Sequence, residues 1–161
     1  MPNTDRKRLR LEGYDYRTEG VYYITVCTAN KEKTLCSISP PEIEGDYPKI
    51  LLTPLGRIVE EAIKRIPGID KYAVMPNHVH MILFQNGEKT ISTKIRLWKS
   101  VIARQTKCSI WQSHFYDHII RDEADYRVKW KYIDENPIKW ASGEFIGIQE
   151  EDIAFHRNPQ P

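Results

Sequence analysis

The sequence predicts an α+β fold in which helices cover one face of an antiparallel sheet, followed by a C-terminal helix that carries Tyr132. Short segments rich in β-branched and aromatic residues recur along the chain. Between them, two segments repeat apolar residues every three or four positions, which is typical of amphipathic helices. The resulting order is strand, helix, strand, strand, helix, strand, and this order favours a ferredoxin-like topology.

Length and composition fit one globular domain. The chain has 161 residues, of which 40% are hydrophobic and 29% charged, and this length is enough to bury a core. We expect a single domain over residues 1–145, in which residues 1–12 form a basic arm. Residues 146–161 are expected to form a polar tail.

The cysteines and the absence of long apolar segments favour a cytoplasmic protein with no membrane partner. Cys27, Cys36 and Cys108 are odd in number and form no CxxC motif, which argues against a disulfide framework. The N-terminus lacks the apolar core of a signal peptide, and no apolar stretch approaches the length of a membrane span.

The first third of the chain is expected to supply one strand, a loop and a helix. Residues 20–28 predict the first strand, residues 30–48 a surface loop, and residues 49–52 a short extended segment. Thr53 and Pro54 suit the N-cap and first position of a helix. Its apolar stripe comprises Leu55, Ile58, Val59, Ala62, Ile63 and Ile66. We expect this helix to pack on the core and to have no chemical role.

The middle of the chain predicts a strand pair and a second amphipathic helix. Residues 72–75 and 78–84 are the expected strands, separated by Pro76 and Asn77. Residues 91–107 predict the helix, and its buried stripe is marked by Ile91, Ile95, Trp98 and Ile102. Trp98 lies on that stripe, so we expect it to pack in the core and not to stack on bases.

The last third predicts a strand and a helix. Residues 110–120 are aromatic and β-branched and predict a final strand or strand pair. It contains His114 and His118, which we interpret as structural or DNA-facing. Residues 122–136 predict the last helix, which should stop at Asn136 because proline at the next position disfavours helical geometry.

His78 and His80 form the first candidate site. Side chains alternate along a strand, so these two imidazoles should point side by side to one face. Neutral imidazole is the commonest metal ligand in proteins, and two imidazoles on a rigid element supply half of a metal site. The alternative is a pair of hydrogen-bonded histidines on a half-buried strand.

Tyr132 and Asn136 form the second candidate site. Residues four apart share one face of a helix, so the two side chains should project together. A phenol can act as a covalent nucleophile, and an amide oxygen can bind a metal. The expected helix end at Asn136 would let its side chain turn towards the sheet. The alternative for Tyr132 is a tyrosine packed between helix and sheet.

Basic residues suggest where phosphates could be bound, although the net charge is only +2. One group lies in the N-terminal arm and another in the helix at residues 91–107. The candidate DNA-binding residues are Arg6, Lys7, Arg8, Arg10, Lys94, Lys99 and Arg104. The helix could equally present an ordinary solvated face. Tyr14, Tyr16 and Tyr116 could stack on unpaired bases or pack in the core.

Several motifs resemble one family when they are taken in order. They are PNHVH at residues 76–80, WQ at residues 111–112, YDHIIRDE at residues 116–123 and the pattern YIxxNP at residues 132–137. These segments resemble the single-tyrosine HUH transposases, and most closely the REP-associated tyrosine transposases. RLEGYDY at residues 10–16 and GVYYITVCT at residues 20–28 are also similar to that family. The resemblance covers about residues 8–140.

The resemblance implies the same fold and a reaction on single-stranded DNA, commonly at the foot of a hairpin or repeat end. Tyr132 would be the catalytic nucleophile, giving a covalent 5′-phosphotyrosine and a free 3′-OH, without a nucleotide cofactor. His78, His80 and Asn136 would bind a divalent metal. Three such ligands leave positions open for a phosphate oxygen and water, and Mg²⁺ or Mn²⁺ suits that set.

Two other functions stay open at this point. The chain could be a domesticated DNA-hairpin-binding protein that no longer cleaves, or a different small metal hydrolase. The second is disfavoured because no Asp or Glu accompanies the histidine pair within its motif. Many relatives are dimers with shared sites, so a homodimer, with Tyr132 completing a partner's site, also stays open.

Overall fold

A computed structural model describes residues 19–144 of the chain. The expected basic arm with its four cationic residues, Tyr14, Tyr16 and the polar tail lie outside the described residues. The proposed domain limits therefore stay predictions.

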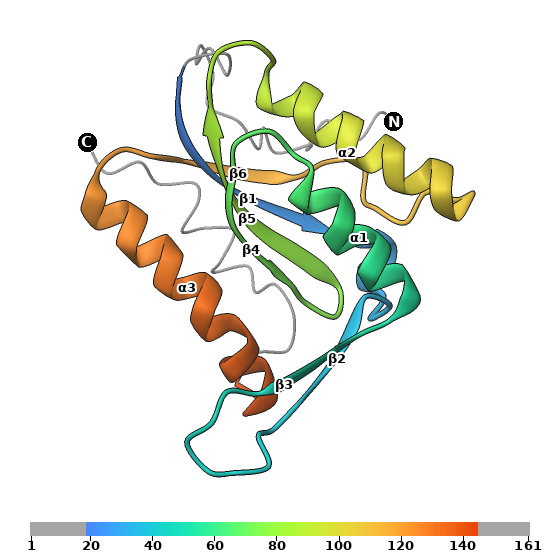
Figure 1. The fold of residues 1–161 in the computed structure, drawn as a ribbon, viewed down its shortest axis with the longest axis vertical. Helices are drawn as coiled ribbons and strands as arrows, with labels where there is room; N and C mark the ends of the chain where they lie inside the picture. Colours follow the sequence, from blue (N-terminus) through green and yellow to red (C-terminus); the bar gives the residue numbers. More distant parts are fainter. Residues whose placement is uncertain (1–18, 145–161) are drawn as a thin grey trace, which may run out of the picture.

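Four strands form the main sheet, and neighbouring strands are antiparallel throughout. They are β1 (Gly20–Cys27), β4 (Ile69–Val74), β5 (His78–Gln85) and β6 (Tyr116–Ile120). Their order across the sheet is β4-β5-β1-β6. Helix α1 (Pro54–Lys64) connects β1 to β4 by way of a small hairpin, and α2 (Ile91–Thr106) connects β5 to β6. This arrangement confirms the predicted ferredoxin-like topology (Figure 1).

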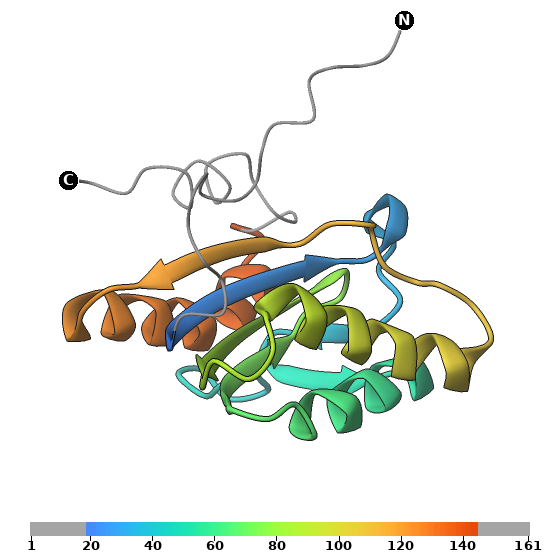
Figure 2. The same ribbon diagram turned by 90° about the horizontal axis from the view of Figure 1, so that it is seen from above.

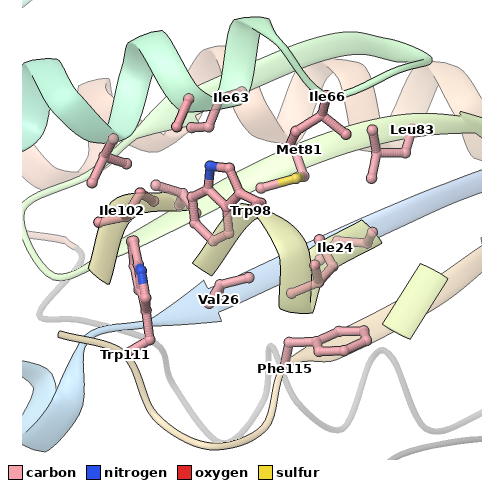
Figure 3. Packing of buried hydrophobic residues seen from close by; sticks show 14 of the residues in the cluster. Ile24, Val26, Ile63, Ile66, Met81, Leu83, Trp98, Ile102, Trp111 and Phe115 are labelled. Carbon is pink, nitrogen blue, oxygen red and sulfur yellow. The ribbon is translucent and has the colours of Figure 1, made fainter. Parts of the chain in front are cut away.

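The sheet separates two layers of helix. Tyr22, Ile24 and Val26 of β1 pack with α1 and α2 in the large core cluster, where side chains from both helices meet those of the sheet (Figure 3). Tyr23 alternates with them and joins Ile133 of α3 (Glu123–Ala141) in a smaller cluster on the other face. Figures 1 and 2 show α3 on its own side of the sheet. His78, His80 and Ile82 are two residues apart along β5, so their side chains point to the same face of the sheet. Ile82 packs in the smaller cluster with Ile133, and the two histidines therefore also face α3.

The start of α1 follows the local rules that predicted it. Thr53 accepts a hydrogen bond from the Gly56 amide at 3.0 Å, and Pro54 occupies the first helical position. Trp98 of α2 is 3% exposed and lies within the large cluster, so its predicted core role is confirmed.

Gly56 is required by a close approach of α1 to the chain before β2. A Cβ at this position would lie 1.9 Å from the Leu35 carbonyl oxygen. We expect Gly56→Ala to destabilise the fold by roughly 3 kcal/mol, because backbone atoms must move apart. Thermal unfolding should show a fall in melting temperature of several degrees. In the control Gly20→Ala, the added Cβ meets only a ring atom of Tyr22 at 3.8 Å; equal melting temperatures for the two variants would contradict this prediction.

Part of the predicted loop at residues 30–48 is a strand. β2 (Cys36–Ser39) pairs with β3 (Lys49–Leu52) in a separate two-stranded sheet, and a short 3-10 helix, η1 (Ala29–Lys31), precedes it. β2 has only four residues and gains its strand conformation from pairing with β3, so its own sequence gives little signal. The predicted segment at residues 49–52 is confirmed. The last predicted strand is shorter than expected: β6 begins at Tyr116, and Trp111 forms an isolated bridge with Thr28.

The predicted end of the last helix at Asn136 is wrong. α3 continues through Pro137 to Ala141. Proline at this point removes one amide donor, but the helix continues to its C-cap, Ser142, whose amide donates to the Ile138 carbonyl at 3.0 Å. Pro137 is itself buried, so packing against the rest of the fold compensates for the lost bond. Within residues 19–144, no helix has the length and hydropathy of a membrane span.

Candidate functional site

The two histidines of β5 converge beneath α3. His78 is 0% exposed and His80 is 1% exposed. Their Nε2 atoms lie 3.0 Å apart, although the two residues are separated along the strand by Val79. This distance results from the alternation that places both side chains on one face of the sheet.

Neighbouring polar groups hold the outer nitrogen of each ring. His78 Nδ1 lies 2.7 Å from the Asn77 side-chain oxygen, which only accepts, so Nδ1 donates and Nε2 keeps its lone pair. His80 Nδ1 lies 2.7 Å from the Tyr23 hydroxyl and 2.8 Å from the Thr25 hydroxyl. Because hydroxyls accept as well as donate, His80 can adopt the same tautomer. Both Nε2 lone pairs can then face one point, with the rings fixed by outer partners.

Burial also keeps His78 neutral. Desolvation lowers the pKa of His78 from 6.5 to about 3. At physiological pH the ring is therefore uncharged, which is the form that binds metals.

This lowered pKa predicts acid sensitivity of the metal-free protein. The unfolded chain protonates His78 near pH 6.5, whereas the folded chain resists protonation down to about pH 3. Folding stability from this residue is thus present above pH 6.5 and is lost as pH falls towards 3. Urea unfolding between pH 7 and pH 4 should show a flatter pH dependence in His78→Gln than in wild type. Desolvation also lowers the pKa of His114, but this residue is exposed whereas His78 is fully buried. His114→Gln should therefore flatten the pH dependence less, and an unchanged slope in His78→Gln would refute the prediction.

Three side chains of α3, spaced four apart, lie over the histidine pair. The Tyr132 ring is 5.5 Å from the His80 ring, measured between centroids, and roughly perpendicular to it. The Trp140 ring is 6.4 Å from the His78 ring. Asn136 lies between them on the same helix face and is 1% exposed. Its Oδ1 atom is buried without a hydrogen-bond partner among the described residues. A helix end was expected to turn the Asn136 side chain towards the sheet. Instead, Asn136 lies within the continuous helix, on the same face as Tyr132.

The residues present fit a divalent cation. Two ligand atoms about 2.1 Å from one octahedral ion, at a right angle, lie about 3.0 Å apart, and the two Nε2 atoms are 3.0 Å apart. Within residues 19–144, no group of three His, Cys, Asp or Glu side chains is placed to hold a metal. The unpaired amide oxygen of Asn136 would fit as a third donor, since a buried acceptor without a partner is costly.

Cations that the sequence analysis did not single out surround this site. Lys129 is 2% exposed, and its Nζ lies 5.0 Å from the centroid of the Tyr23 ring. Lys139 Nζ lies 5.7 Å from the Tyr132 ring centroid, and Lys33 Nζ lies 5.4 Å from the Trp140 ring centroid. Helical spacing from Tyr132 could have identified Lys129, whereas Lys33 comes from a distant loop and carried no sequence signal.

The basic residues predicted on α2 are not brought to this site, because α2 lies on the opposite face of the sheet. Lys94 is buried and donates to the Pro67 carbonyl at 3.2 Å. Lys99 donates to the Gln112 carbonyl at 2.7 Å. Both ammonium groups thus bind backbone carbonyls of the fold, and their interpretation as phosphate ligands stays a prediction. Arg104 is exposed on α2, and its DNA contact stays a prediction.

The remaining candidates take structural positions or flank the site. His118 Nε2 lies 2.7 Å from an Asp125 carboxylate oxygen, which joins β6 to the start of α3. The Tyr116 hydroxyl lies 3.4 Å from His114 Nε2. These contacts suit the structural interpretation of both histidines.

Comparison with known proteins gives this site a context. No protein-family model matches the chain. An uncharacterised protein of Haemophilus influenzae is 32% identical over 168 aligned residues, covering 84% of this chain and 89% of that protein. A REP-associated tyrosine transposase of Escherichia coli is 30% identical over 99 residues, covering 55% of this chain and 58% of that protein.

A solved structure supports the same relationship at the level of the fold. A REP-associated tyrosine transposase bound to a REP hairpin superposes with a TM-score of 0.60 and 24% identity, covering 81% of this chain and 74% of that one. Its fold agrees with the antiparallel sheet and flanking helices described above. Together with the sequence match to the Escherichia coli protein, this similarity of fold supports a transposase family like the REP-associated tyrosine transposases for this chain.

Proposed function

We propose that the protein is a metal-dependent endonuclease and strand-transfer enzyme for single-stranded DNA, with Tyr132 as its covalent nucleophile. One observation supports this most strongly. The Tyr132 ring lies beside His80, and the unpaired Asn136 amide oxygen lies one turn further along the same helix. The proposed nucleophile and the three proposed metal donors would thus share one small site.

His78, His80 and Asn136 would hold a divalent cation, Mg²⁺ or Mn²⁺. When bound, the cation would act as a Lewis acid towards a phosphate oxygen of the substrate. The outer partners Asn77, Tyr23 and Thr25 would orient the two imidazoles.

Tyr132 would attack the scissile phosphorus through its phenol oxygen. The phenol loses its proton, a Tyr132–phosphorus bond forms, and the bond from phosphorus to the 3′ oxygen breaks. The departing oxygen takes up a proton as a free 3′-OH, and the tyrosine holds the 5′ phosphate. A second 3′-OH can attack the same phosphorus and release Tyr132, so strands are rejoined without a nucleotide cofactor.

Nearby positive charge would favour ionisation of the phenol. Lys139 Nζ lies 5.7 Å from the Tyr132 ring centroid, and the buried Lys129 lies one turn earlier on α3. An opposite charge near an acid stabilises its ionised form. These lysines would therefore assist Tyr132 as it loses its proton.

DNA hairpins are the proposed substrate, because the structurally similar transposase is bound to a REP hairpin. The test uses a library of single-stranded hairpins labelled at the 3′ end, incubated with protein and Mn²⁺ and separated on a denaturing gel. A labelled species at the mass of the protein is expected, since the 3′ fragment stays on Tyr132. A 5′ label should appear only on a shorter free strand.

Hairpin retention on a native gel without a covalent species would contradict the proposed enzyme. It would favour instead a hairpin-binding protein that does not cleave. Multi-angle light scattering on the same preparation would show whether a homodimer forms.

A further inference from the structure

Trp140 lies near the end of α3, outside both core clusters of the described residues. It lies in the last turn of α3, half-buried, with its ring centroid 6.4 Å from that of His78. The exposed Lys33, from the loop that follows η1, places its Nζ 5.4 Å from the same ring centroid. An indole, an imidazole and an ammonium group therefore meet at one end of the histidine pair.

Core packing does not account for this placement. Trp98 and Trp111 are 3% and 6% exposed and belong to the large core cluster. Trp140 belongs to neither core cluster of the described residues. Its neighbours there include a histidine ring and a lysine ammonium, and such polar groups suit an aromatic surface that contacts a polar ligand.

We propose that Trp140 and Lys33 form a nucleobase-binding subsite beside the cleavage site. The indole stacks on an unpaired base near the scissile phosphate, and the Lys33 ammonium contacts the phosphate of that nucleotide. This inference rests on the proposed function, because it assumes that a single strand passes the histidine pair. Aromatic rings and basic groups combine in this way wherever proteins hold single strands.

The two ends of the histidine pair would have different tasks. Tyr132 lies against His80 and Trp140 against His78, and eight residues of helix separate them by about 12 Å. The strand would thus be held at a nucleotide next to the reacting phosphate. Stacking reads the area of a base more than its hydrogen-bonding edge, so we expect a purine to be favoured.

The test measures binding in a Tyr132→Phe background, where strand cleavage does not interfere. The probes are single-stranded hairpins with short dT arms, in which one 2-aminopurine is moved position by position. We expect strong fluorescence quenching at one arm position. An abasic nucleotide there should weaken binding about 10-fold in the parent protein. Trp140→Leu, which keeps an apolar side chain but removes the aromatic ring, should lose both the quenching and the sensitivity to the abasic nucleotide, and Trp140→Phe should restore part of each.

Trp130 and Lys71 supply a matched control. The Lys71 Nζ lies 4.0 Å from the Trp130 ring centroid. Trp130 is on the same helix as Trp140, but it packs against the smaller core cluster and contacts Lys71 of β4. Trp130→Leu should leave the quenched position unchanged. Lys33→Ala should weaken binding and reduce its salt dependence without moving that position.

The results separate this subsite from the proposed enzyme. Quenching that persists unchanged in Trp140→Leu, or an absence of quenching at every arm position, would overturn the subsite. A covalent adduct in protein with native Tyr132 would still support the enzyme in that case. Conversely, Trp140-dependent quenching without any adduct would retain the subsite and reject strand cleavage.

Discussion

Replacing Tyr132 with phenylalanine is expected to abolish the covalent protein–DNA species while hairpin binding changes little. Phenylalanine keeps the ring that lies 6.1 Å from Tyr23 and 5.5 Å from His80, so the local packing should survive. It removes only the oxygen that would bond to phosphorus. The adduct on a denaturing gel should fall by several orders of magnitude, and the native-gel dissociation constant should stay within about threefold.

Tyr126→Phe is the matched control on the same helix. Tyr126 lies six residues before Tyr132, roughly 240° around the helix axis, and its hydroxyl donates to Asp70 at 2.6 Å. That hydrogen bond raises the pKa of Tyr126 to about 12, which keeps the phenol protonated and a poor nucleophile. Adduct formation should be normal in Tyr126→Phe. The reverse pattern, with adduct lost only there, would move the nucleophile to Tyr126.

Tyr23 is a third phenol near the histidines, but its position gives it another task. It is 0% exposed, and its hydroxyl lies 2.7 Å from His80 Nδ1. The hydroxyl contacts the Nδ1 side of the His80 ring, away from the Nε2 atom that faces His78 and would bind the metal. Tyr23 therefore orients His80, and Tyr23→Phe should reduce adduct yield without abolishing it, in contrast to Tyr132→Phe.

Local patterns predicted those parts of the fold that local interactions stabilise. Strand alternation placed His78 and His80 on one face, and the Thr53 cap placed the start of α1. Both depend on residues close together in sequence. The order of the elements then left few possible topologies, because a strand–helix–strand unit has one favoured handedness.

Predictions failed where distant contacts outweigh local preference. The preference of proline against helical geometry predicted that the last helix ends at Asn136. Burial of Pro137 instead keeps α3 continuous to Ala141. Asn136 still faces the histidines, because helical spacing from Tyr132 continues through it. The role of Asn136 as a metal ligand stays a prediction, whereas the helix end that was expected to position it is wrong. The hydrogen bonds of Lys94 and Lys99 were likewise not predictable from local sequence, since the carbonyls that accept them come from other segments.

The second large effect expected is loss of adduct formation when divalent metal is removed. Excess EDTA should stop the reaction, and added Mn²⁺ should restore it. The two Nε2 atoms at 3.0 Å and the unpaired Asn136 oxygen are the donors concerned. Adduct yield that is unchanged in EDTA would remove the metal from the mechanism.

The Mn²⁺ affinities of single variants, measured without DNA, should rank the contributions of these residues to metal binding. Loss of an outer partner of a metal ligand commonly weakens metal binding about 10–100-fold. Thr25→Val should therefore weaken Mn²⁺ binding by a factor in that range. His80→Ala removes a ligand and should cost more than this. His114→Ala alters an exposed histidine away from the pair and should bind normally. Electron paramagnetic resonance of free Mn²⁺ gives the affinities, and equal values for His80→Ala and His114→Ala would contradict the assignment.

The substitution Asn136→Leu distinguishes a metal site from an ordinary buried polar contact, because the two predict opposite changes in the stability of the metal-free protein. Its Oδ1 lacks a partner among the described residues, so Asn136→Leu should leave the metal-free protein equally stable or more stable. Mn²⁺ should raise the melting temperature of the wild type by mass action and raise that of the variant much less. If Asn136→Leu instead destabilises the metal-free fold and keeps the full Mn²⁺ shift, the amide serves packing, and the histidine pair must find its third donor elsewhere.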